Sequence, residues 1–172
     1  MKDILIIPNP LLREKSIAVT DINNEELKLS KKLIKIMNAA PGVGLAAPQI
    51  GVMKRIIAIN VKELEKEKKI SYTLFNPEIT WYSKEKVKME EGCLSIPGQF
   101  AEIERPEKIF FKYINEKNNV IEKEASGNES RVIQHELDHL DGKLFIDYLS
   151  SLKRNIIYKK INKLKKQGSY EK

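Results

Sequence analysis

The hydrophobic positions in the first third of the chain recur at the spacing of an α-helix. Leu27, Ile34 and Met37 fall on one face of a helix that opens with two glutamates, and Asn23 can cap its start. Pro41 and the glycine that follows it then end the helical pattern. The pattern predicts the first substantial helix between these two limits.

Between residues 55 and 120 the hydrophobic pattern changes to short apolar or alternating runs, which are typical of β-strands. The runs are residues 56–59, 72–75 and 109–113, and turn residues separate them. The stretch 62–69 is dense in charge, so we interpret it as a surface turn or loop. Most of this region is expected to be strand.

Two further helices are predicted in the last third of the chain. Ser126 and Glu129 have the spacing of a capping box, and they precede apolar residues that continue to a stop at Gly142. A second apolar stripe, in the tail, predicts an amphipathic helix that docks on the body and runs until Gly168. This stripe comprises Leu149, Leu152, Ile156, Ile161 and Leu164.

The order of these elements predicts an α+β fold. We expect small mixed or antiparallel sheets packed around a central helix that carries both histidines, with an amphipathic helix at the C-terminus. A length of 172 residues and a hydrophobic content of 41% suit a single domain, residues 1–172. Residues 153–172 form its basic helical tail.

Charge and cysteine content restrict the expected partners and the compartment. The tail holds eight of the 31 basic residues and one of the 24 acidic residues, which leaves 23 of each elsewhere. It could contact a nucleic-acid or ribosomal surface, although a solvated helix face is the simpler interpretation. A single cysteine excludes an internal disulfide and fits a reducing compartment. With neither a secretory signal nor a membrane-spanning run, we expect a cytoplasmic protein without a membrane partner.

Residues 135–139 read His-Glu-Leu-Asp-His, which is the H-E-x-x-H pattern. On a helix, His135 and His139 project from one face and can bind one metal ion, and Glu136 can reach a water on that ion. Such a short pattern also arises by chance, and a helical histidine is often an ordinary core or surface residue. The chain has only two histidines, however, and both belong to this motif. We therefore interpret the motif as a metal site.

The single cysteine can supply a third ligand. A Cys93 thiolate and two imidazoles make a three-ligand set that leaves one coordination position open, as a catalytic metal requires. The alternative is a buried cysteine that acts only as a small hydrophobic residue. Its neighbours favour a site, because Gly92 permits close approach of the backbone and Leu94 can offer its amide N–H to a ligand.

Residues 42–49, which read Gly-Val-Gly-Leu-Ala-Ala-Pro-Gln, are a third candidate segment. Their small side chains allow a substrate or the metal-binding helix to lie against the backbone, and the Gln49 carboxamide can donate to an oxyanion. The spacing matches neither a Walker A loop nor a Gly-x-Gly-x-x-Gly motif. Taken alone, the segment would be a tight turn into a packed strand.

In this order, the three segments resemble the signature motifs of bacterial peptide deformylases. They are Gly-Val-Gly-Leu-Ala-Ala-Pro-Gln at 42–49, Glu-Gly-Cys-Leu-Ser at 91–95 and Gln-His-Glu-Leu-Asp-His at 134–139, and the similarity extends from 8–13 to 141–145. The resemblance implies a metal-dependent amide hydrolase with a single catalytic domain. Such an enzyme removes the N-formyl group from the formylmethionine of nascent polypeptides and releases formate.

The resemblance also implies a role for each candidate residue. The metal ligands would be Cys93, His135 and His139, and Glu136 would act as the acid and base. The Gln49 side chain and the Leu94 amide would be the oxyanion donors. The backbone of the N-formylmethionyl peptide would contact Val43, Gly44 and Gly92, and Val132 would line the pocket for its methionine side chain.

The metal and the substrate pocket are less strictly defined by the resemblance. It favours Fe²⁺ in the cell, although two imidazoles and a thiolate also suit Zn²⁺, Ni²⁺ or Co²⁺. The sequence departs from the family at 127–130, where Gly-Asn-Glu-Ser replaces the usual Gly-Leu-Leu-Ala. These positions usually lie near the methionine pocket, so the departure bears on pocket shape and substrate preference.

Three further interpretations stay open. Glu91 and Arg105 could pair to orient the cysteine segment, or they could be unrelated surface charges. A zinc endopeptidase usually takes a third His or Glu downstream, for which only Asp147 and Glu171 are formal candidates. A structural zinc in a nucleic-acid-binding module would normally need four protein ligands, more than one cysteine and two histidines provide.

Overall fold

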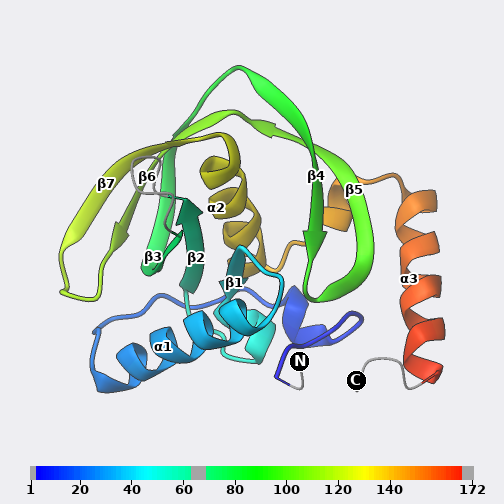
Figure 1. The fold of residues 1–172 in the computed structure, drawn as a ribbon, viewed down its shortest axis with the longest axis horizontal. Helices are drawn as coiled ribbons and strands as arrows, with labels where there is room; N and C mark the ends of the chain where they lie inside the picture. Colours follow the sequence, from blue (N-terminus) through cyan, green and yellow to red (C-terminus); the bar gives the residue numbers. More distant parts are fainter. Residues whose placement is uncertain (1–2, 63–68, 168–172) are drawn as a thin grey trace.

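The computed structural model describes residues 3–62 and 69–167 (Figure 1). The helices are α1 (Asn24–Ala39), α2 (Gly127–Leu140) and α3 (Ser151–Lys166), with 3-10 helices η1 (Pro10–Arg13), η2 (Ala47–Ile50) and η3 (Phe145–Tyr148). The strands are β1 (Gly44–Ala46), β2 (Ile56–Lys62), β3 (Lys69–Tyr82), β4 (Lys86–Cys93), β5 (Ile96–Pro106), β6 (Lys108–Ile114) and β7 (Val120–Ser126). Among the helices in these two ranges, none combines the length and the apolar character that a membrane span requires.

Two antiparallel sheets lie on either side of α2. The larger sheet has the strand order β1-β2-β3-β6-β7, and the smaller one pairs β4 with β5 in a long hairpin. Helix α2 passes between the larger sheet and this hairpin (Figure 1). The predicted α+β fold around a central helix is therefore confirmed.

The strands predicted from short apolar runs lie in β2, β3 and β6. Their buried residues, such as Ile57, Leu74 and Phe111, share one core cluster with α2. The prediction missed β1 and β7, which lie outside the region where strands were expected. β7 has no apolar run because it is an edge strand in which Ala125 alone is buried. The predicted charged turn falls mainly on residues 63–68, which lie outside the described residues.

Helix α1 begins and ends close to the predicted limits. The Asn23 side chain caps it by accepting a hydrogen bond from the Glu25 backbone N–H at 2.8 Å. The buried face differs from the predicted stripe, and it comprises Glu26, Ser30, Leu33 and Met37. Leu27 and Ile34 are only half-buried beside it. The face is displaced because two of its polar side chains hydrogen-bond to neighbouring elements.

Helix α2 begins after Ser126 and ends before Gly142, as predicted, but the predicted capping box is wrong. In the described part of the chain, the Ser126 side chain makes no capping hydrogen bond. The Glu129 carboxylate instead accepts a hydrogen bond from the Tyr72 hydroxyl on β3 at 2.9 Å. A partner on the neighbouring sheet therefore replaces the local one.

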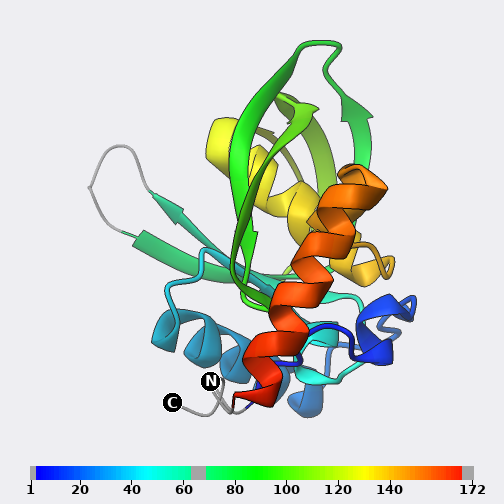
Figure 2. The same cartoon turned by 90° about the vertical axis from the view of Figure 1, so that its right-hand side faces the viewer.

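Helix α3 docks across the β4–β5 hairpin, as Figure 2 shows, but through a different stripe from the predicted one. Ile157 and Ile161 are buried against residues of β5 and η3, whereas Leu152 is 70% and Ile156 44% exposed. The helix ends at Lys166, and the predicted stop at position 168 lies outside the described residues. The docking prediction is thus correct, and two of the residues assigned to the buried face are wrong.

Candidate metal centre

The three residues predicted as metal ligands converge at one point, although they come from two elements. Cys93 is the last residue of β4, whereas His135 and His139 lie one turn apart on α2. One ligand atom from each residue lies within 4.8 Å of the other two. Cys93 Sγ and His139 Nε2 are 3.2 Å apart. A single ion can be bound by all three side chains at this spacing.

The surrounding groups fit a divalent cation. Glu91 Oε2 lies 3.0 Å from His135 Nδ1, which leaves the Nε2 of this ring for an ion. A thiolate and two imidazoles suit a four-coordinate divalent metal whose fourth position is open. Glu136 is buried, and its Oε2 has no hydrogen-bond partner within the described ranges. That oxygen is therefore available to water or to a substrate.

Burial is the largest influence on the protonation of the site. It raises the pKa of Glu136 to about 7, against the opposing charge of His135. It also lowers the pKa of His139 well below its usual value, which favours the neutral imidazole that metals bind. Burial likewise lowers the pKa of His135, but hydrogen bonds with Cys93 and Glu91 outweigh it and raise that pKa to about 10. A cation between ring and sulfur would take the place of this proton.

Gly44 brings the backbone of β1 onto Glu136. A Cβ added at Gly44 would overlap the carboxylate and the side-chain carbons of Glu136, so only glycine leaves room there. Pairing of Gly44 with Ile59 on β2 holds this backbone in position. The predicted close approach of the glycine segment to the metal-binding helix is thus present.

Gln49 lies on η2 with its carboxamide aimed at the cysteine. Its Oε1 accepts a hydrogen bond from the Ala46 backbone N–H at 2.8 Å. Its Nε2 donates to Ser95 Oγ at 3.1 Å and towards Cys93 Sγ at 3.4 Å. The Gln49 Nε2 donor is therefore held beside the Cys93 thiol by the Ala46 backbone N–H at its Oε1 and by Ser95 Oγ at its Nε2.

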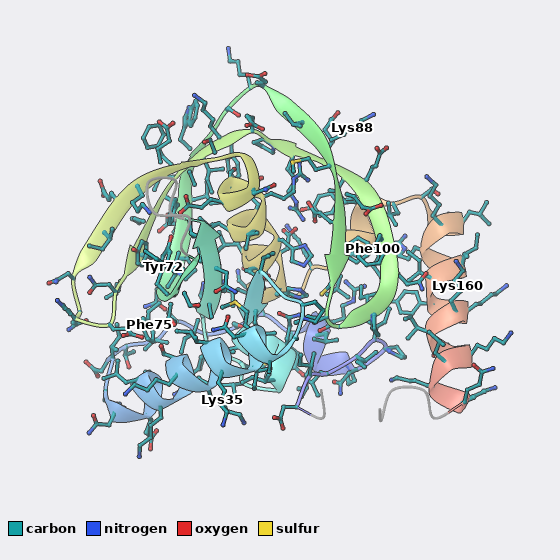
Figure 3. The ribbon with its side chains drawn as sticks, in the orientation of Figure 1. Lys35, Tyr72, Phe75, Lys88, Phe100 and Lys160 are labelled. Atoms are coloured by element: carbon teal, nitrogen blue, oxygen red, sulfur yellow. The ribbon has the colours of Figure 1, made fainter. Side chains whose placement is uncertain are left out.

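The hairpin brings two more predicted residues to the centre. Leu94 follows Cys93 in the turn between β4 and β5, and its Cδ1 would lie 3.0 Å from a Cβ added at Gly42. A Cβ added at Gly92 would meet the ring of Phe100, its cross-strand partner on β5. Figure 3 labels Phe100 on this strand. Sequence reasoning missed this ring, which is 63% exposed and has no sequence signal beyond strand alternation.

Val43 and Val132 are adjacent to site residues but have no described contact with the metal ligands. Val43 directly precedes Gly44 and is 54% exposed. Val132 lies one helical turn before Glu136, is half-buried and packs against the core of the larger sheet. Their contact with a substrate stays a prediction.

A buried network of charges lies behind His135. Arg105 donates from Nε to Glu91 Oε1 at 2.6 Å and from Nη2 to Oε2 at 3.0 Å, so these residues do pair. Burial raises the pKa of Glu91, but hydrogen bonds with His135 and Arg105 outweigh it and lower that pKa to about 2. Arg105 also donates to Asp138 Oδ2 at 2.8 Å. The network therefore ties the hairpin to α2.

Sequence reasoning missed three members of this network. Arg131 Nη1 donates to Glu91 Oε1 at 2.7 Å, and the Tyr148 hydroxyl donates to Asp138 Oδ2 at 2.9 Å. The sequence signal for Asp138 was weak, because residue 138 is one of the two unspecified positions of the H-E-x-x-H motif. Arg131 lies one helical turn before His135 and so on the same face of α2, but this spacing does not show that its side chain is buried.

Comparisons with known proteins agree with this geometry. A family model described as polypeptide deformylase matches residues 1–155. The chain is 47% identical over 165 residues to the peptide deformylase of Pelagibacter ubique, covering 96% of this chain and 95% of that one. It matches the crystal structure of peptide deformylase from Ehrlichia chaffeensis with a TM-score of 0.90 and 38% identity, over 96% of this chain and 97% of that one.

A second Ehrlichia chaffeensis structure, the peptide deformylase in complex with actinonin, matches with a TM-score of 0.88 and 39% identity. The match covers 94% of this chain and 95% of that one. Family model, sequence relatives and solved structures thus agree over nearly the whole length of the chain. The chain belongs to the polypeptide deformylase family, the metal-dependent hydrolases that remove the N-formyl group from nascent polypeptides.

Proposed function

We propose that Cys93, His135 and His139 hold one divalent ion and that Glu136 moves the proton during hydrolysis of N-formylmethionyl peptides. The observation that supports this most strongly is the convergence of one sulfur and two rings within 4.8 Å. Buried Glu136, whose Oε2 has no hydrogen-bond partner among the described residues, adds a group that can exchange protons next to His135.

The residues of the site would share the chemistry as follows. An ion held by this set supplies Lewis acidity towards water and the formyl carbonyl. Glu136 takes a proton from the attacking water and passes it to the leaving amine, as the C–N bond breaks and formate is released. The Gln49 side chain and the Leu94 amide donate to the formyl oxygen, on which negative charge develops as water adds to the formyl carbon.

The substrate backbone would lie along β1 and the hairpin, against Val43, Gly44 and Gly92. β1 is an edge strand of the larger sheet, and an edge strand can pair with an extended peptide. Glycine at two of these positions allows close approach of the peptide. The methionine side chain would enter an apolar pocket that includes Val132.

Two of the polar residues at the start of α2, Glu129 and Ser130, have partners within the protein. Glu129 accepts from Tyr72, and Ser130 Oγ accepts from Gln134 Nε2 at 2.9 Å. Because both side chains are engaged, the pocket would remain suited to methionine. Faster deformylation of formyl-Met-Ala than of a formyl-Gln-Ala peptide would support this preference, and equal rates would contradict it.

A Glu136→Ala variant tests the catalytic assignment. It should release no formate from formyl-Met-Ala while retaining its metal, because the carboxylate moves protons and is not a ligand. A Glu124→Ala variant on β7 removes an exposed carboxylate and serves as the matched control. An active, metal-loaded Glu136→Ala protein would refute the scheme. Cleavage of unblocked peptides by the unmodified protein would instead indicate the endopeptidase alternative.

The cellular metal is proposed to be Fe²⁺, with Zn²⁺, Ni²⁺ and Co²⁺ as the other ions that this donor set accepts. Family resemblance supports iron, and elemental analysis of anaerobically purified protein tests it. A ferrous thiolate site should lose activity in air, because iron and Cys93 can both oxidise. Activity that survives prolonged exposure to air would favour Zn²⁺.

We propose that residues 1–172 form a single catalytic domain, which acts in the cytoplasm where nascent chains are made. Within this domain, the basic tail is proposed to contact the ribosome. Docking of α3 on β5 supports its place in that domain, and its exposed lysines support an electrostatic contact.

Charge reversal tests this contact without removing the docked helix. Lys159→Glu with Lys160→Glu on α3 should weaken cosedimentation with ribosomes at low salt. Lys32→Glu with Lys35→Glu on α1, a separate element (Figure 3), is the matched control. Equal binding by both double variants would reject the ribosome contact.

A further inference from the structure

The Glu91 carboxylate receives hydrogen bonds from three side chains. Arg105 donates to both of its oxygens, Arg131 Nη1 donates to Oε1 at 2.7 Å, and His135 Nδ1 lies 3.0 Å from Oε2. All four residues are buried. One arginine already forms the two-point pair with this carboxylate, so the second must be explained by what else it contacts.

Arg131 connects α2 to both strands of the hairpin. Besides Glu91, its Nη1 donates to the Ile103 carbonyl on β5 at 2.9 Å. Its Nη2 donates to the Val87 carbonyl on β4 at 2.6 Å. The planar guanidinium presents several donors in a rigid arrangement, which a lysine ammonium cannot reproduce. This one side chain of α2 thus hydrogen-bonds to both strands of the hairpin, and within the described residues these two strands form ladders only with each other.

This connection matters because the candidate ligands are divided between the same two elements. Cys93 ends β4, whereas His135 lies on α2, one helical turn after Arg131. A two-stranded hairpin is marginally stable by itself, so its packing on α2 determines where the thiol lies. The separation of sulfur and rings therefore depends on the links between hairpin and helix.

The charges of the network also require the second arginine. Arg105 is shared between Glu91 and Asp138, to which it donates at 2.8 Å. The carboxylates of buried Glu91 and half-buried Asp138 thus face one guanidinium until Arg131 adds a second positive charge. Removing one partner from a buried ion pair leaves an uncompensated charge, which is strongly unfavourable.

We propose that Arg131 is a positioning residue for the metal centre, which holds the β4–β5 hairpin against α2 so that Cys93 stays within reach of His135 and His139. The inference rests on the proposed ligand set. Arg131 acts through Glu91 and the hairpin backbone and touches neither the substrate nor the reacting atoms.

The test uses the full chain loaded with Co²⁺, whose absorption reports thiolate coordination. Arg131→Met should release Co²⁺ to a chelator about tenfold faster or more, which is the scale of effects from groups that orient metal ligands. It should also weaken the sulfur-to-cobalt absorption band. Arg131→Lys keeps the charge but cannot reach every acceptor, so it should give an intermediate rate.

An Arg55→Met variant is the matched control. It removes an arginine whose partner is Asp141, at 2.8 Å and just beyond the end of α2, rather than Glu91. Its Co²⁺ release should match the unmodified protein even where its unfolding temperature falls. If Arg131→Met fails to fold, the faster release by Arg131→Lys relative to Arg55→Met decides the question.

Two outcomes separate failure of this inference from failure of the ligand set. Unchanged release and absorption in both Arg131 variants, with a strong cobalt–thiolate band in the unmodified protein, would overturn the role of Arg131 alone. A Cys93→Ala variant that binds Co²⁺ as tightly as the unmodified protein would overturn the proposed ligands themselves.

Discussion

The backbone of Gly44 lies directly against the carboxylate of Glu136. A Cβ at this position would meet three atoms of one side chain, Cγ, Cδ and Oε1, which are buried and have little room to move. The first strand of the larger sheet therefore limits where the candidate acid and base can point.

A Gly44→Ala substitution should displace this carboxylate and impair proton transfer. We expect kcat for formate release to fall by about 100-fold or more, the scale of a lost general base, with the metal still bound. Gly98→Ala is the control, because a Cβ there meets open space and its positive φ of 67° affects stability only. Steady-state kinetics and metal content measure the outcome. Full activity in Gly44→Ala would show that the contact does not position Glu136.

The Gln49 carboxamide offers a second test, of oxyanion stabilisation. Gln49→Glu keeps an oxygen for the Ala46 N–H but replaces the Nε2 donor by a negative oxygen near Cys93. We expect kcat/KM to fall by about 10²–10³. Ser95→Ala removes one partner of Nε2 and should cause a smaller loss. A Gln49→Glu variant with unchanged kcat would remove this residue from the proposed mechanism.

The helices could be predicted because their limits are local. Each signal depends only on residues close in sequence: the cap at Asn23, the stop at Gly142 and the apolar periodicity between such signals. β1 has no comparable signal, because its three residues, Gly-Leu-Ala, are too few to show alternation and become a strand only by pairing with β2. The face of α3 that is buried likewise depends on which residues of β5 and η3 lie opposite the helix. The apolar periodicity of α3 alone does not define these partners.

The candidate ligands could be recognised because their residue types are rare in this chain. The chain has only two histidines and one cysteine, so no other residue of these types competes with the candidate ligands. Arg131 and Asp138, in contrast, belong to a chain in which 32% of residues are charged. Nothing local separates a buried arginine from an exposed one, so their partners on the hairpin appear only after folding. The pairing of Glu91 with Arg105 could be suggested from sequence but not decided.

Adjacent isoleucines on α3 test how this helix docks. Ile157 is 7% exposed and packs in the cluster with β5 and η3, whereas Ile156 is 44% exposed. Ile157→Ala should lower the free energy of unfolding by about 2 kcal/mol or more. Ile156→Ala should change it by about 0.5 kcal/mol or less. Urea denaturation measures both, and equal effects would contradict the observed orientation of the helix.

The pair of buried Glu26 and half-buried Lys54 predicts a pH dependence of stability that is independent of the metal centre. Lys54 Nζ donates to Glu26 Oε1, and this hydrogen bond lowers the pKa of the carboxyl below its usual value of 4.5, although burial opposes it. Glu26 is 4% exposed, in the first turn of α1. A depressed folded-state pKa stabilises the protein above the unfolded-state value, and this stability is lost as the pH falls through the folded-state value.

A Glu26→Gln variant should therefore be less stable than the unmodified protein at pH 7, by about 1.5 kcal/mol, the scale of a hydrogen bond to a charged group. The difference should shrink below about pH 4.5, where the unmodified protein takes up a proton on Glu26 and loses the same interaction. Urea midpoints between pH 7 and pH 3 measure it. Glu25→Gln, one residue earlier and exposed, is the control and should stay within about 0.5 kcal/mol throughout. A difference for Glu26→Gln that stays constant or widens on acidification would show that Lys54 does not stabilise the ionised carboxylate.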